Sequence, residues 1–183
     1  MHKLSCRNGS GWSEHSFSPV FVQLVTGSGK PFVLAGVPGG DAIVFERLAF
    51  LLEPPYVLLY VLHSPRGEAE PGRYESPALS REELGSFLAR FGGYFSGDGR
   101  FDIWVFAPRE EATIAWDHHN RLFAYGPIER FASELRALGF QSGKPVVPDP
   151  HEHHFRKEFD AQASELLAAF EWEWFELQPQ DGQ

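Results

Sequence analysis

Three apolar runs of strand length follow one another closely in the middle of the chain, at residues 101–106, 112–116 and 121–125. The linkers between them, APREE and DHHN, are short and rich in turn-forming residues. Parallel neighbours need a crossover of about a dozen residues or more, whereas antiparallel neighbours can be joined by short turns. The spacing therefore predicts an antiparallel meander over 101–125 and argues against a doubly wound parallel sheet.

Further strands and helices are predicted around this meander. Residues 20–25 and 32–37 flank the turn sequence TGSGKP and are expected to form a hairpin. The run at 56–63 has no polar face, which predicts a central strand covered on both sides. Helices are expected near residues 41–52, 81–95, 127–138 and 150–172. Hairpin-linked strands with helices that do not alternate with them predict an α+β fold, with an antiparallel or mixed sheet of about four to six strands and about four helices.

All four helices have recognisable start signals: Asp41 can cap the first, and Pro127 opens the third at its first position. Ser80 and Glu83 have the spacing of a capping box before an apolar stripe. Asp149 can cap the last helix, with Pro150 in its first position. The stripe of that last helix would be Phe155, Phe159, Leu166, Phe170 and Trp174.

The domain organisation predicted from composition is simple. We expect residues 20–176 to form a single α+β domain, because 183 residues with an apolar fraction of 43% suffice for one packed core. The Gly/Ser-rich segment 1–19 is expected to be a flexible arm, and residues 177–183 a disordered tail. No run approaches the roughly 20 apolar residues of a membrane span, and no signal peptide is evident. A soluble, cytoplasmic protein is therefore expected, and twelve arginines against four lysines suggest a bacterial source.

Asp117-His118-His119 directly follows the predicted strand 112–116. The triplet resembles the DHH motif of the DHH phosphoesterases, which implies an aspartate and histidines that help to bind a metal pair at a strand end. The upstream aspartates Asp41, Asp98 and Asp102 do not reproduce that family's other aspartate motifs. Asp and Asn are also turn formers. We therefore predict that residues 117–120 form a hairpin turn without bound metal, and we keep the metal site as the alternative.

A second histidine cluster lies at the start of the helix expected over 150–172. On a helix, His151, His154 and Glu158 would share one edge, because they are three and four positions apart. Histidine and carboxylate are ligand types that zinc and nickel accept. A polar, solvated first helical turn explains the same residues without a metal, and it is the interpretation that we favour.

The negative charge is concentrated near the C-terminus. From residue 149 onward there are nine acidic and two basic residues, so this segment carries −7 of the net charge of −9. Aromatic residues are interleaved with the acids there, which suits a protein interface. We expect Trp174 to continue the buried stripe and Trp172 to be the more exposed tryptophan. The expected partner surface consists of Trp172, Trp174, Glu171, Glu173 and Glu176.

Taken together, these features favour a non-enzymatic, acidic protein-binding module. An inhibitor of the immunity-protein kind or a small adaptor, with a basic protein as partner and no cofactor, fits its size and charge. Nucleic acid and anionic membrane are not expected as partners of a chain with a net charge of −9. The alternative is a metal-dependent hydrolase with ligands from Asp117, His118 and His119.

Overall fold

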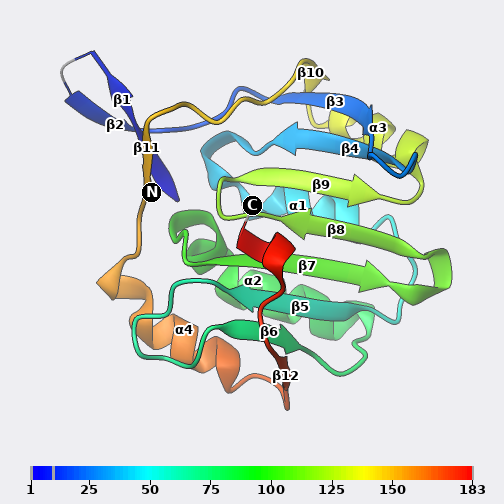
Figure 1. Ribbon diagram of the computed structural model, residues 1–183. Coiled ribbons are helices and arrows are strands. Elements are labelled where there is room, and N and C mark those ends of the chain that lie inside the picture. Colours follow the sequence, from blue (N-terminus) through cyan, green and yellow to red (C-terminus); the bar gives the residue numbers. More distant parts are fainter. Residues whose placement is uncertain (1, 10, 183) are drawn as a thin grey trace.

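The computed structural model describes residues 2–9 and 11–182, and it has an α+β architecture. Within these residues the larger sheet has nine strands, in the order β10-β3-β4-β9-β8-β7-β5-β6-β12 (Figure 1). Its neighbouring strands are antiparallel, except that β10 runs parallel to β3. The strands are β3 (Val20–Val25), β4 (Pro31–Gly36), β5 (Val57–Leu62), β6 (Gly72–Glu75), β7 (Phe101–Ala107), β8 (Ala112–Trp116), β9 (Arg121–Tyr125), β10 (Gln141–Ser142) and β12 (Glu173–Phe175).

The predicted meander is confirmed as β7-β8-β9, and the predicted first hairpin as β3-β4. The mixed sheet is also confirmed, but its strand count exceeds the four to six that the sequence predicted. The additional strands β6, β10 and β12 have two to four residues each. Runs this short have too few positions for an alternating pattern to be recognised.

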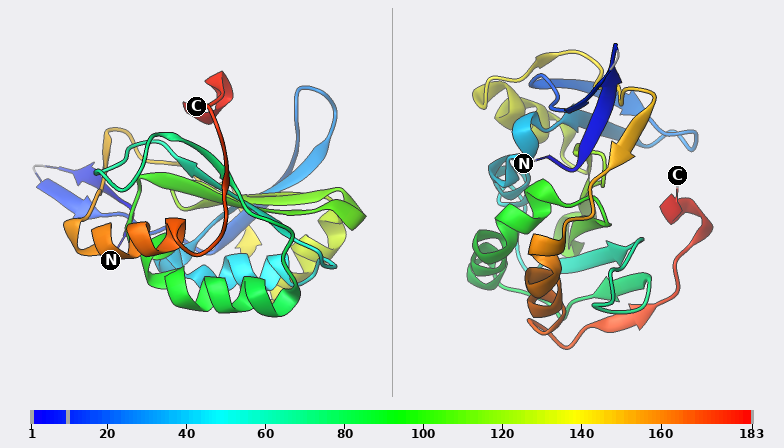
Figure 2. Two further views of the ribbon diagram at one scale, coloured as in Figure 1. Left: turned by 90° about the horizontal axis from the view of Figure 1, so that it is seen from below. Right: turned by 90° about the vertical axis from the view of Figure 1, so that its left-hand side faces the viewer.

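Four α-helices occur in the described part of the chain, as the sequence predicted, and α1–α3 lie against one face of the large sheet (Figure 2). Asp41 caps α1 by accepting a hydrogen bond from the backbone N–H of Ile43, and the predicted capping box of Ser80 and Glu83 opens α2. Their apolar stripes and the inner face of the sheet form the core, around the buried Trp116. The helices are α1 (Ala42–Ala49), α2 (Arg81–Gly97), α3 (Ile128–Ala137) and α4 (Asp160–Leu167).

Within the part of the chain that the structure describes, the opposite face of the large sheet carries no α-helix and is partly open. The sequence suggested that strand β5 is covered on both sides, and this prediction is wrong. Val57 and Leu59 point to the open face and stay partly exposed. Along β7, Asp102, Trp104 and Phe106 also point to this face, since side chains alternate along a strand. The C-terminal segment, including the 3₁₀ turn η4 (Pro179–Gly182), lies over this open face (Figure 2). A disordered tail was predicted for 177–183, of which Gln183 lies outside the described residues.

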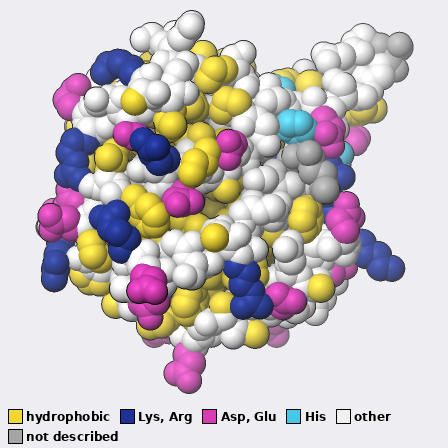
Figure 3. Space-filling view, turned by 180° about the vertical axis from the view of Figure 1, so that it is seen from behind, with side chains coloured by type: hydrophobic (Ala, Val, Ile, Leu, Met, Phe, Trp, Pro, Cys, Tyr) yellow, Lys and Arg dark blue, Asp and Glu magenta, His cyan; other side chains and the backbone are white. Residues whose placement is uncertain are grey.

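A separate three-stranded sheet joins the N-terminal hairpin to residues 151–153, with the order β11-β1-β2. Strands β1 (Leu4–Asn8) and β2 (Gly11–Glu14) form a hairpin, where the sequence predicted a flexible arm. Met1 and Ser10 of that segment lie outside the described residues. Leu4 is fully buried, and β1 pairs with β11 (His151–His153). The hairpin projects from the body of the molecule, with histidine side chains at its base (Figure 3).

The helix predicted over 150–172 is wrong at both ends. Residues 151–153 pair with β1 as a strand, residues 157–159 form the 3₁₀ turn η3 (Lys157–Phe159), and only 160–167 are α-helical. Backbone pairing with a distant segment thus overrides the local cap signal at Asp149 and Pro150. No helix among the described residues is long and apolar enough to cross a membrane.

Candidate functional site

Histidines and aspartates from four separate segments meet at one edge of the large sheet. In an antiparallel sheet, the end of β5, the beginning of β7 and the end of β8 lie at the same edge. His63 follows β5, Asp102 lies near the start of β7, and His118 and His119 follow β8. Strand β11 adds His151 and His153 beside them.

Asp102 is the buried carboxylate at the centre of this cluster. Its Oδ1 accepts a hydrogen bond from the His118 backbone N–H at 2.8 Å and lies 2.7 Å from His118 Nδ1. Its Oδ2 lies 3.2 Å from His63 Nε2. Burial alone would raise the pKa of Asp102, but the close contacts with His118 and His63 outweigh it and hold the pKa below its ordinary value. An ionised carboxylate only accepts hydrogen bonds, so His118 carries its proton on Nδ1 and leaves Nε2 free.

The DHHN linker forms the predicted hairpin turn. Asp117 Oδ1 accepts hydrogen bonds from the backbone N–H groups of His119 and Arg121, and its Oδ2 accepts from Arg121 Nε at 2.8 Å. Asn120 has a φ of 64°, which its short polar side chain tolerates. Asp117 therefore fixes the turn, while His118 and His119 extend from it into the cluster.

Strand β11 supplies two further imidazoles, because residues two apart on a strand share a face. The His153 ring centroid lies 4.9 Å from that of His118 and 4.8 Å from that of His119. The His151 ring lies 5.1 Å from His119, and its Nδ1 is 2.9 Å from the carbonyl oxygen of Pro148. Gly99 allows the His153 ring to lie close to the backbone at residue 99, since a Cβ there would lie 3.2 Å from His153 Nδ1.

Several nitrogen atoms in this cluster are buried without a hydrogen-bond partner among the described residues. They are His153 Nδ1, and two atoms that face a carboxylate without forming a well-aligned hydrogen bond, namely His63 Nε2 at 3.2 Å from Asp102 Oδ2 and His119 Nδ1 at 3.4 Å from Asp117 Oδ2. One potential ligand atom from each of His118, His119 and His153 lies within 4.8 Å of the others, and the same holds for the set His63, Asp102 and His118. Unpartnered buried polar atoms are rare, so this group of them calls for an explanation.

Burial keeps two of these imidazoles neutral. It lowers the pKa of His153 to about 3, and the neighbouring His118, His119 and His151 act in the same direction. Burial also lowers the pKa of His119, although the nearby carboxylate of Asp117, 3.4 Å from His119 Nδ1, opposes the shift. A neutral imidazole has a free lone pair, which is the form that binds a metal.

The sequence prediction identified only part of this site. It found His118, His119 and His151, but it grouped His151 with His154 and Glu158 on a helix that does not form. His154 instead turns away to Ser5 Oγ, at 2.8 Å from its Nε2, and Glu158 is exposed. His63, Asp102 and His153 were missed as ligands. His63 and Asp102 are isolated in the sequence, and only the strand register of 61 with 102 reveals their proximity.

A trough leads from the cluster across the open face of the sheet. A hollow of about 200 Å³ is lined by His63, His118, His153 and Asp181. A neighbouring hollow of about 230 Å³ shares His118 and Asp181 with it and continues to Trp104 and Tyr125. A third, of about 380 Å³, shares Trp104 and Thr113 with the second. The histidine cluster thus opens onto a surface that includes the aromatic side chains of Trp104, Phe123 and Tyr125.

The expected C-terminal partner surface differs from its prediction. Trp172 is half-buried, packs against Tyr60 and Phe87, and donates a hydrogen bond from Nε1 to the Leu166 carbonyl. Trp174 is the more exposed of the two, at 44%. Helix α4 ends at Leu167, and Trp174 lies in edge strand β12. The two tryptophans are therefore not on a helix, so the helical spacing used to predict their exposure does not apply. Glu171, Glu173 and Glu176 are exposed.

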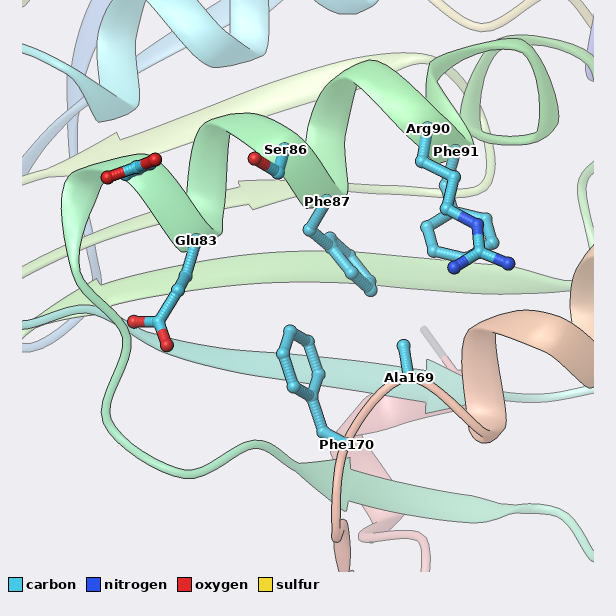
Figure 4. Close-up of a pocket in the computed structure, with 8 residues that line it drawn as sticks. Glu83, Ser86, Phe87, Arg90, Phe91, Ala169 and Phe170 are labelled. Atoms are coloured by element: carbon cyan, nitrogen blue, oxygen red, sulfur yellow. The ribbon is translucent and has the colours of Figure 1, made fainter.

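A further groove of about 340 Å³ lies between α2 and the turn after α4. Phe87 and Phe170 face each other across it, with Glu83 and Arg90 at its rim (Figure 4). Its lining contains no histidine, and Arg90 is paired with Glu165. Glu83 in this lining is engaged in the capping box of α2.

Comparisons of this chain with known protein families, with curated proteins and with solved structures find no match.

Proposed function

We propose that this protein is a metal-dependent hydrolase whose divalent transition metal is held by the histidine cluster. The observation that carries the proposal is the convergence of one ligand atom from each of His118, His119 and His153 within 4.8 Å, where His153 Nδ1 is buried and has no hydrogen-bond partner among the described residues. Imidazole nitrogen is a preferred ligand of zinc, nickel, copper and iron. His63 and Asp102 form the adjoining ligand set through the shared His118.

The surroundings of the cluster support metal binding. Metal-binding histidines usually donate their other ring N–H to a carboxylate or a backbone carbonyl, which fixes the ring. His118 is held in this way by Asp102, and His151 by the carbonyl of Pro148. The DHH resemblance assigned the same turn to metal binding, but Asp117 is engaged by Arg121 and the turn backbone, so the histidines are the better ligands.

Hydrolysis is favoured because the cluster is accessible from the trough. Catalytic zinc sites keep one position open to water or substrate, whereas structural sites are closed by four protein ligands. A bound metal lowers the pKa of its water and polarises a carbonyl or phosphoryl oxygen. The hollows beside His118 supply the space for both the water and the substrate.

Metal analysis of the purified protein, followed by titration of the metal-free protein with Zn²⁺ and Co²⁺, tests this proposal. We expect stoichiometric metal in the wild type, and an affinity loss of about 10-fold to 100-fold or more in His118→Ala and His153→Ala. His154→Gln and Glu158→Gln are matched controls outside the cluster and should keep wild-type affinity. Metal-dependent cleavage of ester, phosphoester or peptide probes should be lost with the same two cluster variants. Absence of stoichiometric binding, or equal losses in the controls, would contradict the metal site.

A second candidate function is protein binding through the acidic C-terminal segment. Trp174 and Phe175 are 44% and 42% exposed on β12, which is an edge strand of the large sheet. An edge strand with exposed aromatic residues can bind a partner by strand addition or by side-chain anchoring. The surrounding carboxylates favour a basic protein as that partner.

A further inference from the structure

The C-terminal segment 176–182 lies over the trough that leads to the histidine cluster. Asp181 lines both hollows that flank His118. Its side chain is 2% exposed, and its Oδ1 has no hydrogen-bond partner among the described residues. A buried carboxylate with an unsatisfied oxygen is costly, so this position suits a ligand group better than a structural one.

The attachment of this segment to the sheet is weak. The hydrogen bonds described for residues 176–182 join residues of the segment to one another, such as that from the Gln178 backbone N–H to Asp181 Oδ2. The ion-pair contact with the sheet is Arg73 Nε to Asp181 Oδ2, at 3.8 Å. A segment held in this way can leave the trough without breaking a strand ladder.

The trough beneath the segment has groups that recognise a peptide. Trp104 Nε1 is buried without a partner and can donate to a backbone carbonyl. Arg73 lies over the Trp104 ring at 5.7 Å, and its Nε is 3.8 Å from Asp181 Oδ2. Arg121, which is paired with Asp117, lines the hollow that contains Asp181. Phe123 and Tyr125 line the same hollow and provide an aromatic surface.

We propose that segment 176–182 occupies the site at which the substrate binds. The trough accordingly binds an external peptide with an aspartate or glutamate side chain at the position of Asp181. This inference deepens the proposed function, because it names the class of molecule brought to the histidines. In the full chain, the segment and the external peptide compete for binding to the trough. Because the peptide contacts are made by Trp104 and the arginines, binding does not require metal.

The test uses a chain that ends at Phe175 and a synthetic peptide with the sequence of residues 176–183. Both proteins are kept metal-free with a chelator, and binding is measured by calorimetry and by the indole N–H resonance of Trp104. We expect the shortened chain to bind the peptide at least tenfold more tightly than the full chain. A matched peptide with Asn in place of Asp181 should bind at least tenfold more weakly than the Asp peptide. Trp104→Phe in the shortened chain should weaken binding of the Asp peptide.

Should the shortened chain fail to fold, the full chain with Asp181→Asn serves instead, since its weakened segment should let the Asp peptide bind. Equal affinities for the Asp and Asn peptides, or no gain on removing or weakening the segment, would overturn the inference. Because the measurement is made without metal, peptide binding with no metal binding would contradict only the proposed hydrolase. Metal binding without peptide binding would contradict only the present inference.

Discussion

Lys3 is the residue whose environment differs most from that of an ordinary surface lysine. It is fully buried, and its Nζ lies 4.5 Å from the centroid of the Trp116 ring and 5.0 Å from that of Phe101. The same Nζ donates a hydrogen bond to the Asp117 carbonyl at 3.0 Å. Burial lowers the pKa of Lys3 to about 8, although Asp117, Asp102 and Asp98 act in the opposite direction. Cation–π contacts and one carbonyl thus compensate only part of the desolvation.

This shift predicts an unusual pH dependence of stability. Between pH 8 and about 10.5 the unfolded chain holds the Lys3 proton while the folded protein has released it, so stability rises with pH. We expect the free energy of unfolding of the wild type, relative to Lys3→Met, to increase by roughly 2 kcal/mol from pH 8 to pH 10. Denaturant titrations of both metal-free proteins measure it, and titration of other residues cancels in the difference. A flat difference would show that Lys3 stays charged when folded.

Among the elements, β11 has the largest effect on the candidate site and was the hardest to predict. The meander and α2 follow from local signals, namely strand length, turn residues and a capping box, and these agree with the tertiary structure. The segment 150–154 carries helix-start signals, yet it pairs with β1, which is nearly a whole chain length away in sequence. A single sequence has no local signal for such a pairing, so the shared face of His151 and His153 could not be deduced.

The pairing predicts that β1 supports the proposed metal site. Leu4 is fully buried and lies opposite His153 in the register. Leu4→Ala should lower the free energy of unfolding by about 2–5 kcal/mol. The same variant should weaken Zn²⁺ binding, because β11 loses the packed strand that positions His153. Val25→Ala is the control, since Val25 is 64% exposed on β3 and should change stability by less than about 0.5 kcal/mol. Unchanged Zn²⁺ affinity in a destabilised Leu4→Ala protein would show that β11 holds its position without β1.

On the scale of the whole molecule, a buried ion network joins elements that are distant in sequence. Arg100 is fully buried and contacts Asp98 at 2.8 Å, Glu68 at 3.0 Å and Asp160 at 3.1 Å. The network connects the end of α2, the loop before β6 and the start of α4. It fixes where α4 begins, and therefore where the chain turns toward β12. The sequence revealed the excess of acid near the C-terminus, but not that Asp160 serves this internal contact.

The acidic C-terminal segment should bind a basic protein through Trp174 rather than Trp172. Trp174→Ala should weaken capture of a partner from cell extract by about 1–3 kcal/mol while leaving stability nearly unchanged. Trp172→Ala should instead lower the free energy of unfolding, because Trp172 packs against Tyr60 and Phe87. Pull-down across a salt series and thermal unfolding of both variants distinguish the two roles. Equal capture by wild type and Trp174→Ala would remove this surface as a binding site.

The sheet that pairs β1 with β11 has a consequence for biosynthesis. The ribosome releases the β1–β2 hairpin about 140 residues before its partner β11 emerges, as the residue ranges of these strands show. His63, Asp102 and His118 are available earlier than His153, so a metal captured during translation would first meet an incomplete set of ligands. Under the proposed function, a tightly held ion therefore marks a chain in which β11 has been synthesised and paired, and a nascent chain stalled before residue 151 would exchange its metal freely.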